Sequence, residues 1–180
     1  MPRYVALFGS VNVGGNRLTM ADLRYAFERE GFENVETVVA SGNVVFEFDE
    51  RPTDGLEDLF SHMMAERFDI ASFVAVRSRD ELAAAIDGNP FAVDGAENQV
   101  HTQFLGGQPS SAQLDDLIAA YSGRGPERLA LGDRALYIDF VAGAGNTRLT
   151  GPFIERRLGY PGTARNQRSL RRILDKMDNK

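Results

Sequence analysis

The stretch that decides the fold is residues 35–48, which read Val-Glu-Thr-Val-Val-Ala-Ser-Gly-Asn-Val-Val-Phe-Glu-Phe. Two runs rich in β-forming residues, 35–40 and 44–48, lie on either side of Ser41-Gly42-Asn43. A short segment of this composition between two such runs is typical of a β-hairpin. We therefore expect two neighbouring antiparallel strands here, and the rest of the first lobe is built outward from them.

On the N-terminal side, a strand is predicted over Arg3–Phe8, followed by an amphipathic helix that Thr19 caps and that Gly31 ends. On the C-terminal side, apolar residues at helical spacing predict a helix through 56–63, and residues 72–76 predict a fourth strand. The resulting order is β-α-β-β-α-β. This is the ferredoxin-like arrangement, in which a four-stranded antiparallel sheet carries two helices on one face.

The second half of the chain predicts the same order again, and the linking helix between the halves begins at the capping box Ser78–Glu81 and stops at Gly88-Asn89-Pro90. We expect an α+β fold with two ferredoxin-like lobes, a linking helix and a C-terminal helix that Asn166 caps. The predicted domains are a first lobe over 1–77, a linking helix and loop over 78–96, and a second lobe with the terminal helix over 97–180. In the second lobe, strands are expected at 101–105, 128–131, 135–140 and 163–165, and helices at 111–121 and 152–158.

Composition excludes several classes of protein. The 180 residues are 43% hydrophobic and 26% charged, as expected of a globular chain. The absence of cysteine excludes disulfides, thiolate nucleophiles and cysteine-based metal sites. No uninterrupted apolar run is long enough to predict a transmembrane helix. We expect a cytoplasmic protein without a membrane partner.

Charge is unevenly distributed along the chain. The net charge is −6, but residues 151–180 hold eight basic and three acidic side chains, which leaves −11 on the preceding 150 residues. A basic end of this kind can meet an anion, an acidic partner or the acidic remainder of its own chain. The sequence leaves these three alternatives open.

Several short motifs are spread over the chain. They are Asn12-Val-Gly-Gly-Asn16, Ser41-Gly-Asn-Val-Val-Phe46, Asn89-Pro-Phe91, Gly145-Asn146 with Arg148-Leu-Thr150, and Thr163-Ala-Arg-Asn166. With these motifs the chain resembles the bacterial family known as domain of unknown function 1697 (DUF1697), which implies a two-lobed ferredoxin-like fold, no established activity and no catalytic residues. Where that family commonly has an arginine and a glycine before its glycine-rich loop, this chain has Gly9 and Ser10, and Gln167 replaces a common tryptophan.

The glycine-rich loop has part of the pattern of a phosphate-binding loop. Gly9 and Gly14 have the spacing of a Walker A motif, but Gly15 stands where that motif needs lysine and Asn16 replaces its Ser or Thr. Without the lysine, the terminal phosphates of a nucleotide lose their main cation, so we reject a P-loop. A tight strand-to-helix connection and a different binding role both remain open.

Two loops share one pattern. Gly15-Asn16-Arg17-Leu18-Thr19 and Gly145-Asn146-Thr147-Arg148-Leu149-Thr150 each place an arginine before a helix-capping threonine. Free N–H groups at a helix start attract anions. We hypothesise a polar site for a small anionic or phosphorylated ligand, although turn asparagines and solvated arginines would give the same pattern. The predicted site residues are Asn12, Gly14, Gly15, Asn16, Arg17, Asn43, Arg148, Arg165 and Asn166.

No catalytic constellation is recognisable. His62 and His101 have no metal-ligand spacing, and neither Ser10 nor Ser41 has a visible base partner. We expect no metal and no cofactor, and whether the chain is an enzyme stays open, with a non-catalytic role favoured.

The rival class is a nucleic-acid-binding or protein-interaction module, because RNA-recognition motifs share this fold and present aromatic residues on a strand. Phe46 and Phe48 share one face of the predicted hairpin, but the leading basic residue of such strands is missing. We expect both rings to pack under a helix or against the other lobe, so nucleic acid is not favoured. The sequence predicts no oligomeric state.

Overall fold

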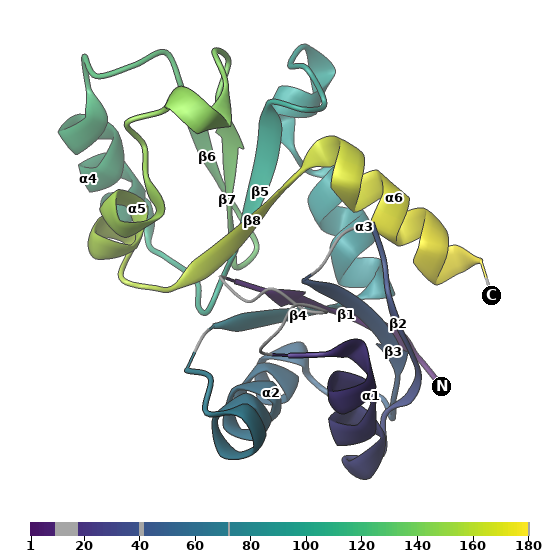
Figure 1. The fold of residues 1–180 in the computed structure, drawn as a ribbon. Helices are drawn as coiled ribbons and strands as arrows, with labels where there is room; N and C mark the ends of the chain where they lie inside the picture. Colours follow the sequence, from purple (N-terminus) through teal and green to yellow (C-terminus); the bar gives the residue numbers. More distant parts are fainter. Residues whose placement is uncertain (10–17, 40–41, 72, 180) are drawn as a thin grey trace. The chain divides into compact units, whose positions relative to one another are not determined.

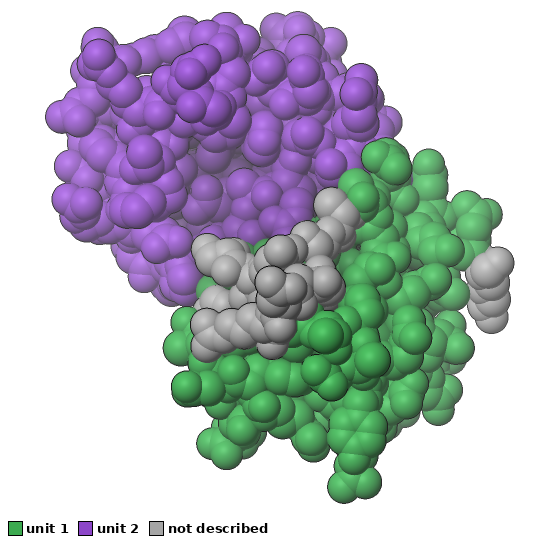
Figure 2. Space-filling model, in the orientation of Figure 1, with its two compact units in different colours: residues 1–83, 172–180 green, residues 84–171 purple. Residues whose placement is uncertain are grey.

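The computed structural model describes residues 1–9, 18–39, 42–71 and 73–179. The chain divides into two compact units, which Figure 2 shows in green and purple. Unit 1 comprises residues 1–83 and 172–180, and unit 2 comprises residues 84–171.

Unit 1 contains one four-stranded antiparallel sheet in the order β2-β3-β1-β4 (Figure 1). Two helices cover one face of this sheet, so the predicted β-α-β-β-α-β order is confirmed. The predicted hairpin is also present, with Val44 opposite Thr37 and Val45 opposite Glu36. Its first strand begins two residues earlier than expected, and the register shifts between Glu33 and Glu36. The elements are β1 (Arg3–Phe8), α1 (Met20–Arg29), β2 (Glu33–Thr37), β3 (Asn43–Glu47), α2 (Thr53–Phe68) and β4 (Val74–Ser78).

The core of unit 1 is aromatic and lies between the sheet and its helices. Phe46 of β3 is fully buried, with ring centroids 4.9 Å from Phe32 and 5.2 Å from Phe60. Phe48 is also buried and packs against Phe32. Alternation along the strand places both rings on the face that α1 and α2 cover. The expectation that they pack under a helix is confirmed, and they are therefore not a base-stacking surface.

Unit 2 repeats the arrangement with a second antiparallel sheet in the order β6-β7-β5-β8. Its core lies on the face covered by α4 and α5 and includes Leu105, Leu117, Ile138 and Ile154. Two short 3-10 helices, η1 (Pro90–Val93) and η2 (Ala144–Asn146), lie in its loops. The other elements are β5 (Val100–Leu105), α4 (Ser111–Tyr121), β6 (Arg128–Gly132), β7 (Ala135–Asp139), α5 (Gly151–Leu158) and β8 (Gly162–Asn166).

The predicted helix caps form as expected. Thr19 Oγ1 accepts a hydrogen bond from the Asp22 amide at 3.1 Å, and Thr150 Oγ1 accepts one from the Phe153 amide at 3.3 Å. The Ser78 hydroxyl accepts from the Glu81 amide at 3.1 Å while the Glu81 carboxylate accepts from the Ser78 amide at 2.9 Å. Each bond satisfies a donor that the first turn of a helix leaves unpaired.

Two further helices have residues in both units. The Ser78–Glu81 capping box begins α3 (Arg79–Asp87), and α6 (Gln167–Asp178) follows β8. The first five residues of α3 belong to unit 1 and its remainder to unit 2, whereas α6 begins in unit 2 and ends in unit 1. None of the helices in the described residues is both long and apolar enough to cross a membrane.

Candidate functional site

The predicted site residues fall into three groups. Asn12, Gly14, Gly15, Asn16 and Arg17 lie outside the described residues. Asn43 belongs to unit 1, where it begins β3, is buried and donates from Nδ2 to the Val38 carbonyl at 3.2 Å. The other three, Arg148, Arg165 and Asn166, belong to unit 2.

Arg165 and Asn166 are neighbours in β8 with different roles. The Arg165 guanidinium donates to Thr163 Oγ1 at 2.8 Å and to the Ala164 carbonyl at 2.9 Å. Burial lowers the pKa of Arg165 to about 10, because removal from water disfavours the charged form. Asn166 Oδ1 accepts from the Ser169 amide at 2.8 Å and so caps α6, as predicted.

Arg148 lies in the loop that precedes α5, and this loop is held in place on both sides of the arginine. Thr147 Oγ1 donates to Glu127 Oε1 at 2.6 Å and accepts from the Leu149 amide at 3.0 Å. The Leu149 side chain is buried in the core of unit 2, whereas Arg148 is exposed. Leu18 occupies the equivalent buried position before Thr19 in unit 1. In both places the leucine is buried and the threonine caps the following helix.

A buried polar group lies under the same loop. The Tyr121 hydroxyl is buried beside Glu127, Thr147 and the backbone of Arg148, and burial raises the pKa of this phenol. Burial by itself would raise the pKa of Glu127 as well, but hydrogen bonds to its carboxylate, chiefly the one from Thr147, outweigh this effect and lower it. Glu127 is therefore ionised at neutral pH and fixes the loop.

Two arginines of unit 2 stack on Phe153 in the first turn of α5. The guanidinium carbon of Arg157 is 4.1 Å from the centroid of the Phe153 ring, and that of Arg124 is 5.3 Å from it. Arg148 lies close by, because its backbone is beside the Tyr121 hydroxyl and the Tyr121 ring packs edge-on against Phe153 at 5.8 Å. We call Arg124, Arg148 and Arg157 the arginine cluster.

Among the described residues, none of the three guanidinium groups of the arginine cluster forms an ion pair with a carboxylate. Stacking on an aromatic face holds a guanidinium in position but leaves its edge N–H donors available. The first amides of α5 add positive partial charge next to them. The chemistry of this arrangement is recognition of an anion.

The basic end of the chain finds some of its partners within the protein. Arg171 pairs with Glu97 at 3.1 Å in unit 2, and Lys176 pairs with Glu36 at 3.3 Å in unit 1. Two of the eight basic residues after position 150 therefore meet the acidic remainder of the same chain, which was one of the three alternatives.

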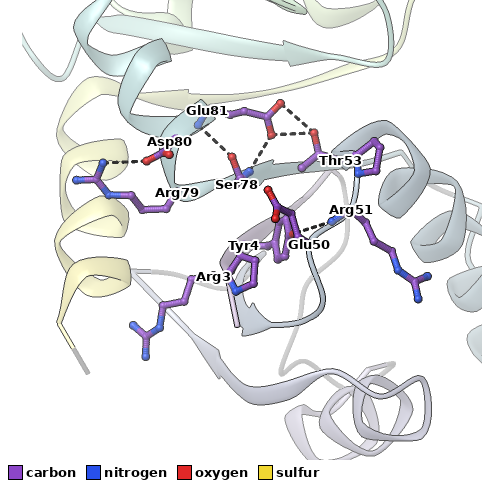
Figure 3. A pocket seen from close by; sticks show the side chains of 11 residues that line it. Arg3, Tyr4, Glu50, Arg51, Thr53, Ser78, Arg79, Asp80 and Glu81 are labelled. Atoms are coloured by element: carbon purple, nitrogen blue, oxygen red, sulfur yellow. Dashed lines mark hydrogen bonds and ion pairs between the residues drawn. The ribbon is translucent and has the colours of Figure 1, made fainter.

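A second candidate is a pocket of about 410 Å³ in unit 1 (Figure 3). Its walls come from the start of β1, the segment between β3 and α2, and the junction of β4 with α3. It is lined by Pro2, Arg3, Tyr4, Glu50, Arg51, Pro52, Thr53, Ser78, Arg79, Asp80 and Glu81. The part of the chain that the structure describes contains no group of three or more histidine or carboxylate side chains suited to hold a metal ion.

Sequence reasoning found Arg148 but missed the other members of these sites. Arg124 and Arg157 are far apart in the chain, and only the packing of α5 beside the end of α4 brings both onto Phe153. The one local signal was the pair Arg156-Arg157 after an aromatic residue. Glu50 and Arg51 gave no signal, because charged residues before a helix are common in solvated turns.

Comparison with known proteins places this architecture in a family. The family described as a protein of unknown function, DUF1697, matches residues 1–137. The chain belongs to DUF1697. The family resemblance read from the sequence motifs is therefore confirmed, and it brings no established activity with it.

The DUF1697 chain is also similar to a solved structure, that of a conserved bacterial protein from Streptococcus pneumoniae. The TM-score is 0.72 at 22% sequence identity, and the match covers 99% of both chains. At this identity the likeness concerns the fold alone. The search of curated proteins found no significant match to the DUF1697 chain.

Proposed function

We propose that this protein binds a small anionic ligand, with phosphorylated compounds as the main class, at the arginine cluster of unit 2. The observation that supports the proposal is the pair of guanidinium groups held on one Phe153 ring without a carboxylate partner. We further propose that the protein acts in the cytoplasm.

The positive charge of this cluster contrasts with the acidic character of the whole chain. The protein carries a net charge of −6, and its acidic residues outnumber its basic ones by 26 to 20. Acidic partners are therefore plentiful, and arginines such as Arg171 find one. Three arginines without carboxylates next to a helix start create a local positive potential that a phosphate relieves.

The cluster shares Arg148 with the site predicted from the sequence. The glycine and asparagine loop over residues 12–16 stays a prediction for the same ligand class. An arginine-rich surface beside an aromatic ring also suits the backbone of a single-stranded nucleic acid. Binding of a small anion and binding of a single-stranded nucleic acid are distinguished by the size of the ligand that the protein binds.

A titration followed by two-dimensional NMR tests the proposal, with inorganic phosphate, pyrophosphate and a mixed-sequence single-stranded oligonucleotide as probes. Pyrophosphate is expected to shift the amide signals of residues 148–157. The substitutions Arg124→Gln and Arg157→Gln are each expected to weaken its binding about tenfold, since a charge-assisted contact contributes about 1.5–3 kcal/mol. Arg29→Gln makes the same charge change on α1 in unit 1 and is the matched control.

Three outcomes are informative. Loss of affinity in both cluster variants, but not in Arg29→Gln, supports the proposal. Shifts that spread over the whole surface, or equal losses in the control, show non-specific attraction and refute it. If the oligonucleotide binds much more tightly than pyrophosphate and its affinity depends steeply on salt, the ligand is a nucleic acid and not a small anion.

A further inference from the structure

The three members of the arginine cluster lie on three different segments of unit 2. Arg124 belongs to the loop that joins α4 to β6, Arg148 to the loop before α5, and Arg157 to α5 itself. Side chains on separate segments bind one ligand well only when the segments are held in place relative to one another. A group of buried contacts beneath the cluster connects these segments.

The first loop is closed by the residues at its two ends. Tyr121 is the last residue of α4, and Glu127 directly precedes β6. The Tyr121 hydroxyl and Glu127 Oε2 are both buried. A Cβ added to Gly125 would overlap Glu127 Oε2 and lie 2.7 Å from the Tyr121 hydroxyl, so only glycine lets the loop fold this closely over the two oxygen atoms. Within this loop, the Arg124 amide donates to the Tyr121 carbonyl at 3.0 Å.

The second loop is bound to the same carboxylate. Thr147 Oγ1 donates to Glu127 Oε1 at 2.6 Å, and Thr147 directly precedes Arg148. The Tyr121 hydroxyl also lies beside the backbone of Arg148. Glu127 therefore connects the loop of Arg124 to the loop of Arg148, with one carboxylate oxygen facing each.

The third arginine is connected through an aromatic contact. The Tyr121 ring packs edge-on against Phe153, with 5.8 Å between the ring centroids, and Phe153 is the ring on which Arg157 and Arg124 stack. The helices that carry these two rings, α4 and α5, are neighbours (Figure 1). The same buried contacts thus support all three arginines. We call them the Glu127 network, which consists of Tyr121, Glu127 and Thr147.

We infer that Glu127 and Tyr121 are positioning residues of the anion site, a role that rests on the proposed function of the arginine cluster. They do not touch the ligand. They act by holding the loops of Arg124 and Arg148 in the arrangement that receives it. A ligand that meets arginines already held in place does not have to order them on binding, and this raises its affinity.

The sign of the effect distinguishes positioning from simple electrostatics. The Glu127 carboxylate is negatively charged, so its charge by itself opposes the binding of an anion nearby. Removal of this charge alone is expected to leave the affinity for an anion unchanged or to raise it. Removal of the hydrogen bonds that hold the loops is expected to lower the affinity, because the arginines lose their fixed arrangement.

Two substitutions at position 127 separate these effects in a pyrophosphate titration followed by NMR. Glu127→Gln removes the charge and keeps an oxygen that accepts from Thr147, so its affinity for pyrophosphate is expected to equal or exceed that of the unsubstituted protein. Glu127→Ala removes the charge together with the hydrogen bonds, and its affinity is expected to fall about tenfold. The two variants differ in sign although both lose the same charge.

A double-mutant cycle tests whether Glu127 acts through Arg148. In an Arg148→Gln background, one of the two loops that Glu127 holds no longer carries a guanidinium. Glu127→Ala is therefore expected to weaken pyrophosphate binding only about threefold in that background, instead of about tenfold. An equal loss in both backgrounds contradicts an action through Arg148.

Two further variants control for stability and folding. Gly132→Ala at the end of β6 places a Cβ 2.6 Å from a Tyr137 ring carbon, so it is expected to destabilise the protein without weakening pyrophosphate binding. Tyr121→Phe removes one hydroxyl from the Glu127 network and keeps the ring against Phe153. It is expected to weaken pyrophosphate binding about threefold, and it decides the question if Glu127→Ala does not fold.

Failure of this inference is distinguishable from failure of the proposed function. The proposed function fails if pyrophosphate does not bind the unsubstituted protein, or if it binds independently of Arg124 and Arg157. The positioning role alone is overturned if pyrophosphate binds at the arginine cluster but Tyr121→Phe and Glu127→Ala bind it as tightly as the unsubstituted protein. It is equally overturned if Glu127→Gln weakens binding as much as Glu127→Ala, or if Gly132→Ala does.

Discussion

The buried ion pair between Glu57 of α2 and Arg77 of β4 gives the sharpest quantitative prediction. Arg77 Nη1 lies 2.7 Å from Glu57 Oε2, and only 3% of the Arg77 side chain and 7% of the Glu57 side chain are exposed. The same carboxylate oxygen accepts a hydrogen bond from the Val76 amide at 2.8 Å. Because β4 is an outer strand of its sheet, Glu57 pairs an amide that has no neighbouring strand on that side.

The substitution Glu57→Ala removes the carboxylate from both groups. It takes the Glu57 carboxylate away from the buried Arg77 cation and from the Val76 N–H. Breaking a buried pair in this way costs about 3–5 kcal/mol of the free energy of unfolding. For a protein of this length, such a loss lowers Tm by about 10 °C.

A second variant distinguishes the effect of the buried charge on stability from the effect of the cavity. In Glu57→Leu combined with Arg77→Met, both charges are gone and apolar groups fill the space, which is often close to neutral for stability. The double variant still loses the acceptor of the Val76 N–H, about 1–3 kcal/mol, and the hydrogen bond from Arg77 to the Val76 carbonyl. The double variant is therefore expected to be more stable than Glu57→Ala.

Urea unfolding followed by circular dichroism measures both effects. Glu66→Ala, on the exposed side of α2, is the control and is expected to change the free energy of unfolding by less than about 0.5 kcal/mol. A loss below about 1 kcal/mol in Glu57→Ala would falsify the reasoning, as would a double variant less stable than the single one.

Three further predictions concern unit 2. Burial lowers the pKa of His101 below its ordinary value near 6.5, so the folded state binds fewer protons than the unfolded state, and stability is expected to fall as pH drops from about 6.5 toward 5. His101→Phe should remove this slope in urea titrations at several pH values, and an unchanged slope contradicts the assignment. Gly132→Ala places a Cβ 2.6 Å from a Tyr137 ring carbon, and the forced shift is expected to cost about 1–3 kcal/mol in the same assay. Thr147→Val removes the hydroxyl that donates to Glu127 at 2.6 Å, so it should destabilise the protein by about 1–2 kcal/mol and also weaken pyrophosphate binding. An unchanged affinity for pyrophosphate would show that this loop does not contribute to binding at the arginine cluster.

The sequence predicted most of the regular structure because its signals there are local. Capping residues act within three positions, as in Thr19 with Asp22 and Asn166 with Ser169, and these bonds form as expected. The limits of β2 were less well predicted. The pattern of apolar residues indicated 35–40, but the strand covers Glu33–Thr37 with a register shift and a positive φ at Asn34. Such an irregularity depends on the pairing with β3 and leaves no trace in the alternation of side chains.

The two loops that share a motif also differ in what is local in sequence and what depends on tertiary contacts. Sequence alone revealed the repeated arginine, leucine and threonine before a helix. It did not reveal that Thr147, the residue by which the second loop exceeds the first, donates to Glu127 from 20 positions earlier. That bond, rather than the shared motif, fixes the backbone next to Arg148.

By itself, then, the sequence determined the order of strands and helices, the family and the caps, because periodicity and capping act over a few residues. Only the tertiary structure decided which charges lack partners. Glu57 meets Arg77, and Arg171 meets Glu97, across many positions of the chain. Ion pairing depends on which side chains strand pairing and helix packing bring within a few ångströms. Once these ion pairs are known, the arginine cluster, Glu50 and Arg51 remain as charged groups that form no ion pair with the described residues.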